Sequence, residues 1–189
     1  MTASDISLAV CKKLVLIASL ILFSGCHGDP SGELILFDFE SDTELDQLSW
    51  SCHTLYSLSR DHSTHGTKSL KLELFPSDYP GLVPFLAVKD WRGFKEFCFD
   101  AYNPSKDTVR IVVRMDDRKD FPVYEDRYNK SFVVKHGSNH FSIPLDTLVT
   151  SGTNRRLDLS QIHRLFIFTA HPEKKITLYI DTIKILRNN

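Results

Sequence analysis

Long apolar runs are missing from this chain of 189 residues. The longest run, residues 14–23, has about ten residues, whereas a helix that crosses a bilayer needs roughly twenty. An excess of charge is missing as well, because 23 Lys and Arg residues face 24 Asp and Glu residues and no segment is rich in basic side chains. These absences argue against a transmembrane anchor and against the basic surface with which nucleic-acid-binding proteins neutralise phosphates.

The sequence also lacks the motifs of common enzymes. It contains no Gly-x-Ser-x-Gly, no His-Glu-x-x-His and no glycine-rich phosphate loop. His62 and His65 have a spacing that converges on a helix, but the glycine and hydroxyl residues around them predict a loop. Asp116 and Asp117 are adjacent and would point to opposite sides of a strand, which is poor geometry for a glycosidase pair. We therefore expect no independent enzymatic activity.

Cysteine is scarce, with four residues, and no spacing among them is typical of a zinc site. Cys26, Cys52 and Cys98 lie beyond the first 25 residues. Cys52 and Cys98 can form one disulfide in an oxidising compartment. They can equally be two separate buried thiols, because free cysteine is often a small core residue. The sequence leaves both alternatives open.

Residues 1–25 have the organisation of a signal segment. Two lysines precede the apolar residues 14–23, and the small residues Ser24 and Gly25 follow, which suits a signal peptidase site. We therefore expect a cleaved signal peptide over residues 1–25 and a protein that leaves the cytoplasm. The remainder, about 164 residues with a charge near −2, has the size of one domain.

Residues 23–26, Phe-Ser-Gly-Cys, resemble the lipobox of bacterial lipoprotein precursors, although Phe23 stands where that motif prefers Leu. The resemblance implies that Cys26 is lipidated with acyl chains such as palmitate and that residues 26–33 form a tether. Two or more acyl chains hold a protein stably at a membrane. The implied location is the bacterial cell envelope, lipid-anchored to either membrane. An ordinary secretory signal cut near Gly25 is the alternative.

The remaining chain, residues 34–187, consists of short segments rich in aromatic and β-branched residues that are separated by turn residues. These segments predict about nine strands, over Leu34–Phe39, Ser69–Phe75, Leu82–Val88, Phe94–Tyr102, Thr108–Met115, Lys130–Lys135, Asn139–Ile143, Arg164–Thr169 and Ile176–Leu186. Only Asp42–Leu48 and Asp158–Ile162 predict a helical turn. The fold class is therefore all-β, a β-sandwich jelly roll in one domain, with an up-and-down barrel as the main alternative.

Alternation along two of these strands predicts a polar surface. Side chains change sides at every residue of a strand. In one strand an apolar side alternates with Arg110, Arg114 and Asp116, and in the strand before it Asp100 and Tyr102 share the polar side. If the two strands are neighbours, these residues lie on one sheet surface. Such a surface either binds polar ligands or is simply solvated and stabilised by ion pairs.

Five short motifs resemble the carbohydrate-binding-module-like jelly rolls of the galactose-binding-like fold, and they occur in the same order. They are Phe-Asp-Phe-Glu-Ser at 37–41, His-Gly-Thr-Lys-Ser-Leu-Lys-Leu at 65–72, Asp-Trp-Arg-Gly-Phe at 90–94, Ala-Tyr-Asn-Pro at 101–104 and Leu-Tyr-Ile-Asp-Thr-Ile-Lys at 178–184. The resemblance spans nearly all of residues 33–186. It implies a jelly-roll fold and carbohydrate binding, but not a particular ligand, because one fold hosts many functions.

The same resemblance implies a structural calcium ion. In that fold the first and last strands commonly lie together, and calcium often sits where they meet. Asp38 and Glu40 fall on one side of the first predicted strand and Asp181 lies in the last, which supplies three hard oxygen donors. Alternatively, these carboxylates only accept hydrogen bonds at the edge of the sandwich.

The densest group of polar and aromatic residues begins near the end of the strand 108–115. Sugars bind to planar rings that cover their apolar faces and to charged or amide groups that bond to their hydroxyls. The candidate ligand-binding residues are Arg114, Asp116, Tyr124, Asp126, Arg127, Tyr128 and Asn129. In the alternative reading, Asp126 and Arg127 pair with Arg114 and Asp116 and only fix the loop.

These features together predict a non-catalytic, membrane-anchored lipoprotein that binds carbohydrate, either an envelope polysaccharide or an exported one. The alternative is a structural or assembly lipoprotein that binds an envelope protein through the same sheet face. No nucleic acid partner is expected. Among the other aromatic residues, Trp91 is expected in the core and Tyr79 on an exposed turn.

Overall fold

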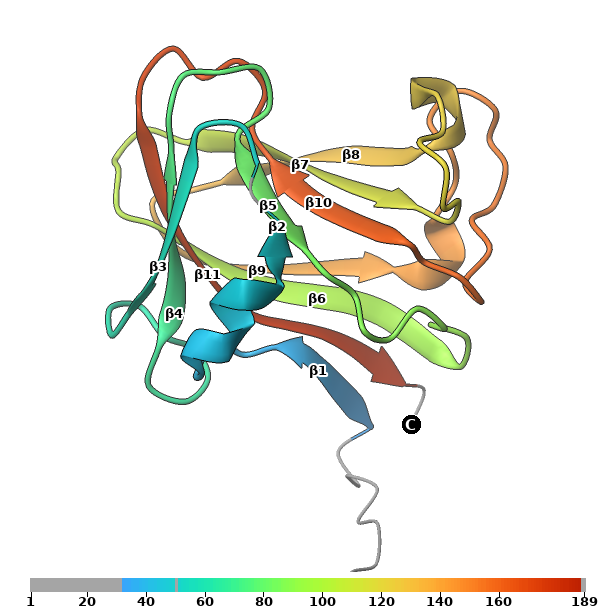
Figure 1. Cartoon of the computed structure of the whole chain (residues 1–189), viewed down its shortest axis with the longest axis horizontal. Helices are drawn as coiled ribbons and strands as arrows, with labels where there is room; N and C mark the ends of the chain where they lie inside the picture. Colours follow the sequence, from blue (N-terminus) through green and yellow to red (C-terminus); the bar gives the residue numbers. More distant parts are fainter. Residues whose placement is uncertain (1–31, 50, 188–189) are drawn as a thin grey trace, which may run out of the picture. The chain divides into compact units, whose positions relative to one another are not determined.

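The computed structural model describes residues 32–49 and 51–187 (Figure 1). The expected signal peptide over residues 1–25, the lipidation site Cys26 and most of the tether at 26–33 lie outside the described residues and stay predictions. In the described part of the chain, no helix is long and apolar enough to cross a membrane.

The first of two antiparallel sheets contains six strands in the order β3-β4-β11-β6-β9, with β1 pairing with β11. These strands are β1 (Glu33–Phe37), β3 (Thr54–Ser59), β4 (Ser69–Leu74), β6 (Phe94–Asn103), β9 (Gly137–Pro144) and β11 (Ile176–Arg187). The long β11 pairs with β4 through its first half and with β1 through its second half. The first and last strands are therefore neighbours, as the resemblance implied.

The second sheet contains five strands in the order β2-β5-β10-β7-β8. They are β2 (Leu48–Ser49), β5 (Gly81–Pro84), β7 (Val109–Asp116), β8 (Tyr128–Val134) and β10 (Arg164–Phe168). Three short 3₁₀ turns complete the secondary structure of the described residues, namely η1 (Asp42–Gln47), η2 (Tyr124–Asp126) and η3 (Leu145–Thr147). The expected all-β sandwich is confirmed.

The sequence did not reveal β2 and β3. In β3, Leu55 is 56% exposed while its neighbour Tyr56 is half-buried, so the strand has no clean alternation of apolar and polar residues. β3 lies at the edge of its sheet and pairs only with β4. The strand therefore forms because it pairs with β4, and not because its own sequence alternates between apolar and polar residues.

The core lies between the two sheets, and Trp91 occupies it as expected. Its side chain is fully buried, its indole nitrogen donates to the Val88 carbonyl over 3.1 Å, and its ring stacks on Phe97 at 5.6 Å. Alternation in β7 also agrees with expectation, because Val109, Ile111, Val113 and Met115 are buried and Arg110 is exposed on the opposite side.

The single polar surface expected from β6 and β7 is wrong. These consecutive strands belong to different sheets, since β6 pairs with β9 and β11 whereas β7 pairs with β8 and β10. The outward residues Asp100 and Tyr102 of β6 therefore lie on the first sheet. Arg110 and Arg114 lie on the second sheet, on the opposite side of the sandwich.

Of the two alternatives left open for Cys52 and Cys98, the structure has free thiols rather than a disulfide, with Cys98 buried and Cys52 exposed. Cys52 lies in the turn before β3 and Cys98 lies in β6, with β4 and β11 between the two strands. Three strand spacings of about 4.8 Å separate them, far beyond the roughly 4.4–6.8 Å between the Cα atoms of a disulfide. Burial raises the pKa of the Cys98 thiol.

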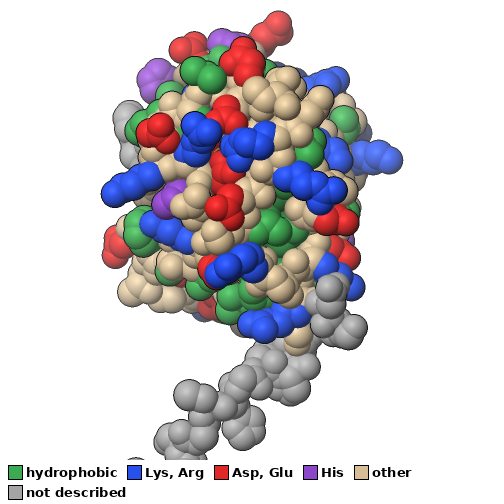
Figure 2. Space-filling view, turned by 90° about the vertical axis from the view of Figure 1, so that its right-hand side faces the viewer, with side chains coloured by type: hydrophobic (Ala, Val, Ile, Leu, Met, Phe, Trp, Pro, Cys, Tyr) green, Lys and Arg blue, Asp and Glu red, His purple; other side chains and the backbone are tan. Residues whose placement is uncertain are grey.

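A charged network fixes the loop between β7 and β8. Arg155 donates to both carboxylate oxygens of the buried Asp117, over 2.6 and 2.9 Å, and to Asp126 over 2.9 Å. Burial raises the pKa of Asp117, but the bonds from Arg155 and from the Asp158 N–H outweigh it and hold this pKa below its ordinary value. Figure 2 shows acidic and basic side chains interleaved on the side of the domain that carries η2 and η3.

We expect Arg155→Met to lower the free energy of unfolding by about 3 kcal/mol at pH 7, because it leaves a buried carboxylate without its cation. The lowered pKa of Asp117 means that its ionised form stabilises the fold. That stabilisation is complete above the unfolded pKa of about 3.9 and declines as the pH falls through the lower folded value. The difference between the wild type and the variant in urea unfolding should therefore narrow at pH 3.

Arg118→Met provides the matched control, because Arg118 is 53% exposed where it pairs with Asp126. An exposed ion pair contributes less than about 1 kcal/mol, so this variant should stay close to the wild type. Equal losses in the two variants, or an Arg155→Met effect independent of pH, would contradict the role assigned to Asp117.

Candidate functional site

The outer face of the second sheet brings together outward residues of β7 and β10. In the antiparallel register Arg164 lies opposite Asp116, Phe166 opposite Arg114, and Phe168 further along β10. The intervening residues of β10 are buried in the core. Two outward phenylalanines thus lie along β7, Phe166 directly beside Arg114 and Phe168 beside Val112.

Three rings form an aromatic strip on this face, made of Tyr79, Phe166 and Phe168. Phe166 and Phe168 stack with their centroids 4.4 Å apart, and Tyr79 meets Phe168 edge to face at 5.6 Å. Tyr79 is 46% exposed, as expected for its turn. Gly81 lies opposite Phe168, where a Cβ would come within 2.5 Å of the Phe168 Cβ. Glycine at this position therefore makes room for the strip.

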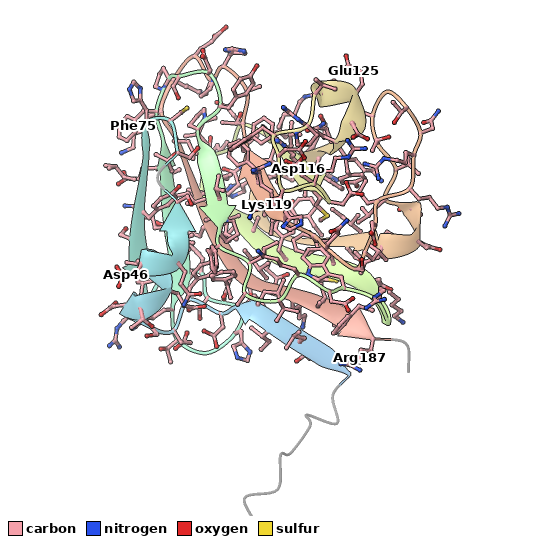
Figure 3. All side chains as sticks on the ribbon, turned by 45° about the vertical axis from the view of Figure 1, so that its right-hand side comes forward. Asp46, Phe75, Asp116, Lys119, Glu125 and Arg187 are labelled. Atoms are coloured by element: carbon pink, nitrogen blue, oxygen red, sulfur yellow. The ribbon has the colours of Figure 1, made fainter. Side chains whose placement is uncertain are left out.

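Three guanidinium groups surround one carboxylate at the end of the strip, and we call Arg114, Arg127 and Arg164 the arginine cluster. Asp116 is fully buried and accepts hydrogen bonds from Arg114 Nε, over 2.8 Å, and from Arg164 Nη1. The side chains of Arg114 and Arg164 are only 13% and 18% exposed. In Figure 3, Asp116 lies among nitrogen-bearing side chains.

Arg127 adds a third cation to this cluster. Its Nε donates to the Pro122 carbonyl over 2.6 Å. Burial lowers the pKa of Arg127, and the charges of Arg114 and Arg164 lower it further, while Asp116 acts in the opposite direction. Glu125 also acts on Arg127, so three cations face two carboxylates and one positive charge remains in excess, which attracts electron-rich or anionic groups.

An exposed ring covers part of the arginine cluster. The guanidinium carbon of Arg164 lies 4.2 Å from the centroid of Phe121, and Phe121 is 80% exposed. This cation–π contact holds the planar ring beside the aromatic strip. The outer face thus combines apolar rings with guanidinium donors.

Of the predicted ligand-binding residues, the structure brings Arg114, Asp116, Arg127 and Asn129 to this face. Asn129 pairs directly with Arg114 across β7 and β8, and its amide lies 3.4 Å from Ser151 Oγ. The ligand-contacting role predicted for Asp116 is wrong, because its fully buried carboxylate cannot contact a ligand. It positions the two arginines instead.

Tyr128 as a ligand-binding residue is wrong. It lies opposite Met115 in the register of β7 and β8, on the side of the strand that faces the core, and it is 5% exposed. Its buried hydroxyl has no hydrogen-bond partner among the described residues, and burial raises its pKa to about 12. The ring fills the sandwich and does not contact a ligand.

Tyr124 and Asp126 lie on η2, away from the strip. Tyr124 is 60% exposed, whereas both Asp126 oxygens are held by arginines, one by Arg155 and the other by Arg118 at 3.0 Å. Asp126 therefore fixes the loop, as the alternative reading held, but through arginines other than Arg114. Its carboxylate is not free for a sugar hydroxyl.

The calcium ion expected at Asp38, Glu40 and Asp181 stays a prediction. Glu40 and Asp181 each accept two backbone N–H groups of the 64–68 loop, at distances between 2.6 and 3.0 Å. The N–H bonds from this loop lower the pKa of Glu40. Accepting hydrogen bonds is the role that the alternative interpretation gave these carboxylates, and among the described residues no group of three or more His, Cys, Asp or Glu is placed to hold a metal ion.

Four residues of this face were not predicted as site residues from the sequence, namely Phe121, Arg164, Phe166 and Phe168. The signal for three of them was present, because Arg-Leu-Phe-Ile-Phe at 164–168 alternates polar or aromatic residues with aliphatic ones. That alternation places the first, third and fifth residues on one side of the strand. Phe121 carries no such signal, since its position depends on the course of a loop.

No family model and no curated protein sequence matches the chain. Solved structures match it at low identity. The family 11 carbohydrate-binding module from Clostridium thermocellum, solved in complex with a β-1,3-1,4-mixed-linked tetrasaccharide, is 19% identical with a TM-score of 0.60, over 82% of this chain and 95% of that one. A solution structure of CtCBM11 is 19% identical with a TM-score of 0.64, over 86% of this chain and 99% of that one.

An exo-β-agarase structure also matches, with 19% identity and a TM-score of 0.66 over 82% of this chain. The match covers only 25% of the agarase, so the chain corresponds to about a quarter of that enzyme. At these identities the matches establish the fold. The described domain therefore has the jelly-roll fold of carbohydrate-binding modules, as the five sequence motifs predicted.

Proposed function

We propose that this domain binds carbohydrate without catalysis, through the aromatic strip and the arginine cluster on the outer face of the second sheet. The observation that carries the proposal is the placement of partly exposed rings beside Arg114 and Arg164, two poorly solvated guanidinium groups of the arginine cluster. The fold supports it, since a module of the same fold was solved with a tetrasaccharide and another protein containing it with xylohexaose.

Each part of this face has a physical role in binding a sugar. The rings cover the apolar face of a pyranose, and about 100 Å² of covered ring contributes about 2.5 kcal/mol at about 25 cal/mol/Å². The guanidinium groups donate paired hydrogen bonds to hydroxyl or carboxylate oxygens. Because binding also costs translational, rotational and side-chain entropy, one such face gives a weak affinity, with a Kd of about 0.01–1 mM.

The charge of the face favours an anionic glycan. Asp116 and Glu125 balance two of the three cations of the arginine cluster, and the remaining positive charge is only partly solvated. A carboxylate or sulfate on a sugar would compensate it. A polyuronate or a sulfated polysaccharide is therefore the class of ligand that this face fits best.

The proposed location is the bacterial cell envelope, with the domain anchored to a membrane through lipidated Cys26. This part of the proposal rests on the lipobox-like residues 23–26. Anchoring many weak single-site domains on one surface raises their effective concentration, so that together they hold a repetitive polymer strongly. An envelope or exported polysaccharide would provide such a polymer.

We expect Phe168→Ala to weaken binding of the full chain to its polysaccharide by about tenfold or more, because the variant removes half of the stacked pair. Binding is measured by affinity electrophoresis against a panel of neutral and acidic polysaccharides, in a detergent without a sugar headgroup. Phe75→Ala, which removes a half-buried ring at the end of β4, should leave binding unchanged.

Failure of every polysaccharide to retard the wild-type chain would contradict the proposal. The alternative would then gain support if a purified envelope protein bound the wild-type chain but not Phe168→Ala. In that case the same face would serve a protein partner.

The charge preference has its own test in Arg127→Gln. We expect this variant to lose about tenfold in affinity for polygalacturonate, with little change for a neutral β-glucan, because it removes a cation that only an anionic sugar compensates. Sodium chloride should weaken the polygalacturonate complex in parallel. Arg92→Gln, at an exposed ion pair with Asp90, is the control. Equal losses on neutral and acidic glycans would contradict the preference for an anionic ligand.

A further inference from the structure

A hollow lies on the outer face of the first sheet. It has a volume of about 230 Å³ and is lined mainly by His62, Tyr102, Tyr179, Asp100, His140 and Ser138. None of these residues belongs to the aromatic strip or to the arginine cluster, and the two sheets turn their outer faces to opposite sides of the sandwich. The hollow is therefore separate from the proposed glycan-binding face.

Three neighbouring strands form the floor of the hollow. In one row Tyr102 of β6 pairs with Tyr179 of β11 on one side and with Ser138 of β9 on the other. In the next row Asp100 pairs with Asp181 and with His140 in the same manner. Aromatic rings thus lie beside a row of charged and imidazole groups.

His62 forms the wall of the hollow. Its ring stacks on Tyr102 at 3.4 Å with an interplanar angle of 9°, and it meets Tyr179 edge to face at 4.7 Å. His62 has a φ of +60°, a left-handed backbone conformation that is uncommon for a histidine. The loop bends at this residue so that the imidazole covers the tyrosine.

Hydrogen bonds fix this loop over the sheet. The buried carboxylate of Asp181 accepts the backbone N–H groups of Thr64 and His65 over 2.6 and 3.0 Å. The Thr64 hydroxyl donates to Asp100 Oδ2 over 2.7 Å. The wall of the hollow is therefore held in place before any ligand arrives, which reduces the entropy lost on binding.

The polar groups of the hollow leave several hydrogen-bonding atoms free. His140 Nδ1 lies within hydrogen-bond distance of Asp100 Oδ1, at 2.6 Å, which leaves Nε2 as the second polar atom of the ring. Among the described residues, the hydroxyls of Tyr102, Tyr179 and Ser138, which line the hollow, have no hydrogen-bond partner. The hollow thus offers three hydroxyls and an imidazole nitrogen beside aromatic rings.

We propose that this hollow is a second ligand site that holds one neutral sugar residue, either a free monosaccharide or a chain end. Rings that pack on a pyranose and hydroxyls that exchange hydrogen bonds with it are the groups such a ligand requires. The volume is below the roughly 300–1,000 Å³ of pockets that hold drug-sized molecules, which suits a single ring.

Charge separates this site from the arginine cluster. Asp100 and Asp181 place two carboxylates at the floor of the hollow, and they disfavour an anionic sugar by like-charge repulsion. The two outer faces of the sandwich therefore differ in ligand, with an acidic glycan on the second sheet and a neutral sugar residue on the first. The second site does not depend on the function proposed for the other face.

The test is saturation-transfer-difference NMR on the full chain, in a detergent without a sugar headgroup. The probes are methyl β-D-glucoside, methyl β-D-galactoside, methyl α-D-mannoside and methyl β-D-xyloside. We expect at least one of them to bind, and to bind about tenfold more weakly to Tyr102→Ala and to His140→Ala. His140 is an exposed side chain, so its variant tests the site without disturbing the core. Galacturonic acid should compete poorly.

Phe168→Ala is the control, since it alters only the opposite face, and it should bind the glycoside as the wild type does. The proposal is overturned if no methyl glycoside binds, if binding survives both Tyr102→Ala and His140→Ala, or if Phe168→Ala abolishes it. Binding of polygalacturonate to the same preparations separates the two sites, because the glycoside result can fail while the acidic glycan still binds.

Discussion

Every strand of this domain must bury one row of side chains against the opposing sheet, and this constraint decides where the polar and aromatic residues of the strands lie. Since the inner faces of both sheets share one core, the remaining rows face outward on two opposite sides. Arg114 and Phe168 on one side, and Tyr102 on the other, face outward because their neighbours along the strand are buried. Two chemically distinct surfaces follow from one packing rule.

The buried carboxylate of Asp116 organises the first of these surfaces. A charge removed from water is unfavourable unless it is paired and hydrogen-bonded, and Arg114 and Arg164 meet both needs. In return, Asp116 holds two guanidinium groups in fixed positions beside Phe166, and Arg127 supplies positive charge beyond what one carboxylate balances. The charge of the face is thus preorganised by a residue that the ligand does not contact.

Local patterns in the sequence predict the all-β class, about nine of the strands, the buried Trp91 and the alternation within single strands. The sheet to which each strand belongs could not be predicted, since β6 and β7 are consecutive in the chain but pair with distant strands. That limit accounts for the wrong joint surface, and it is also why the sequence left the pairing of Cys52 and Cys98 open. Tyr128 was misplaced because its neighbours resembled a binding loop, while its register opposite Met115 turns it inward.

We propose that the outer face of the second sheet is where this domain binds a glycan. Amide chemical-shift mapping of the isotope-labelled full chain during titration with tetragalacturonate examines this face residue by residue. We expect shifts that concentrate in β7, β10 and the segment at Tyr79, with β3 and β4 unchanged. Shifts confined to the first sheet, or absent at millimolar oligosaccharide, would contradict it.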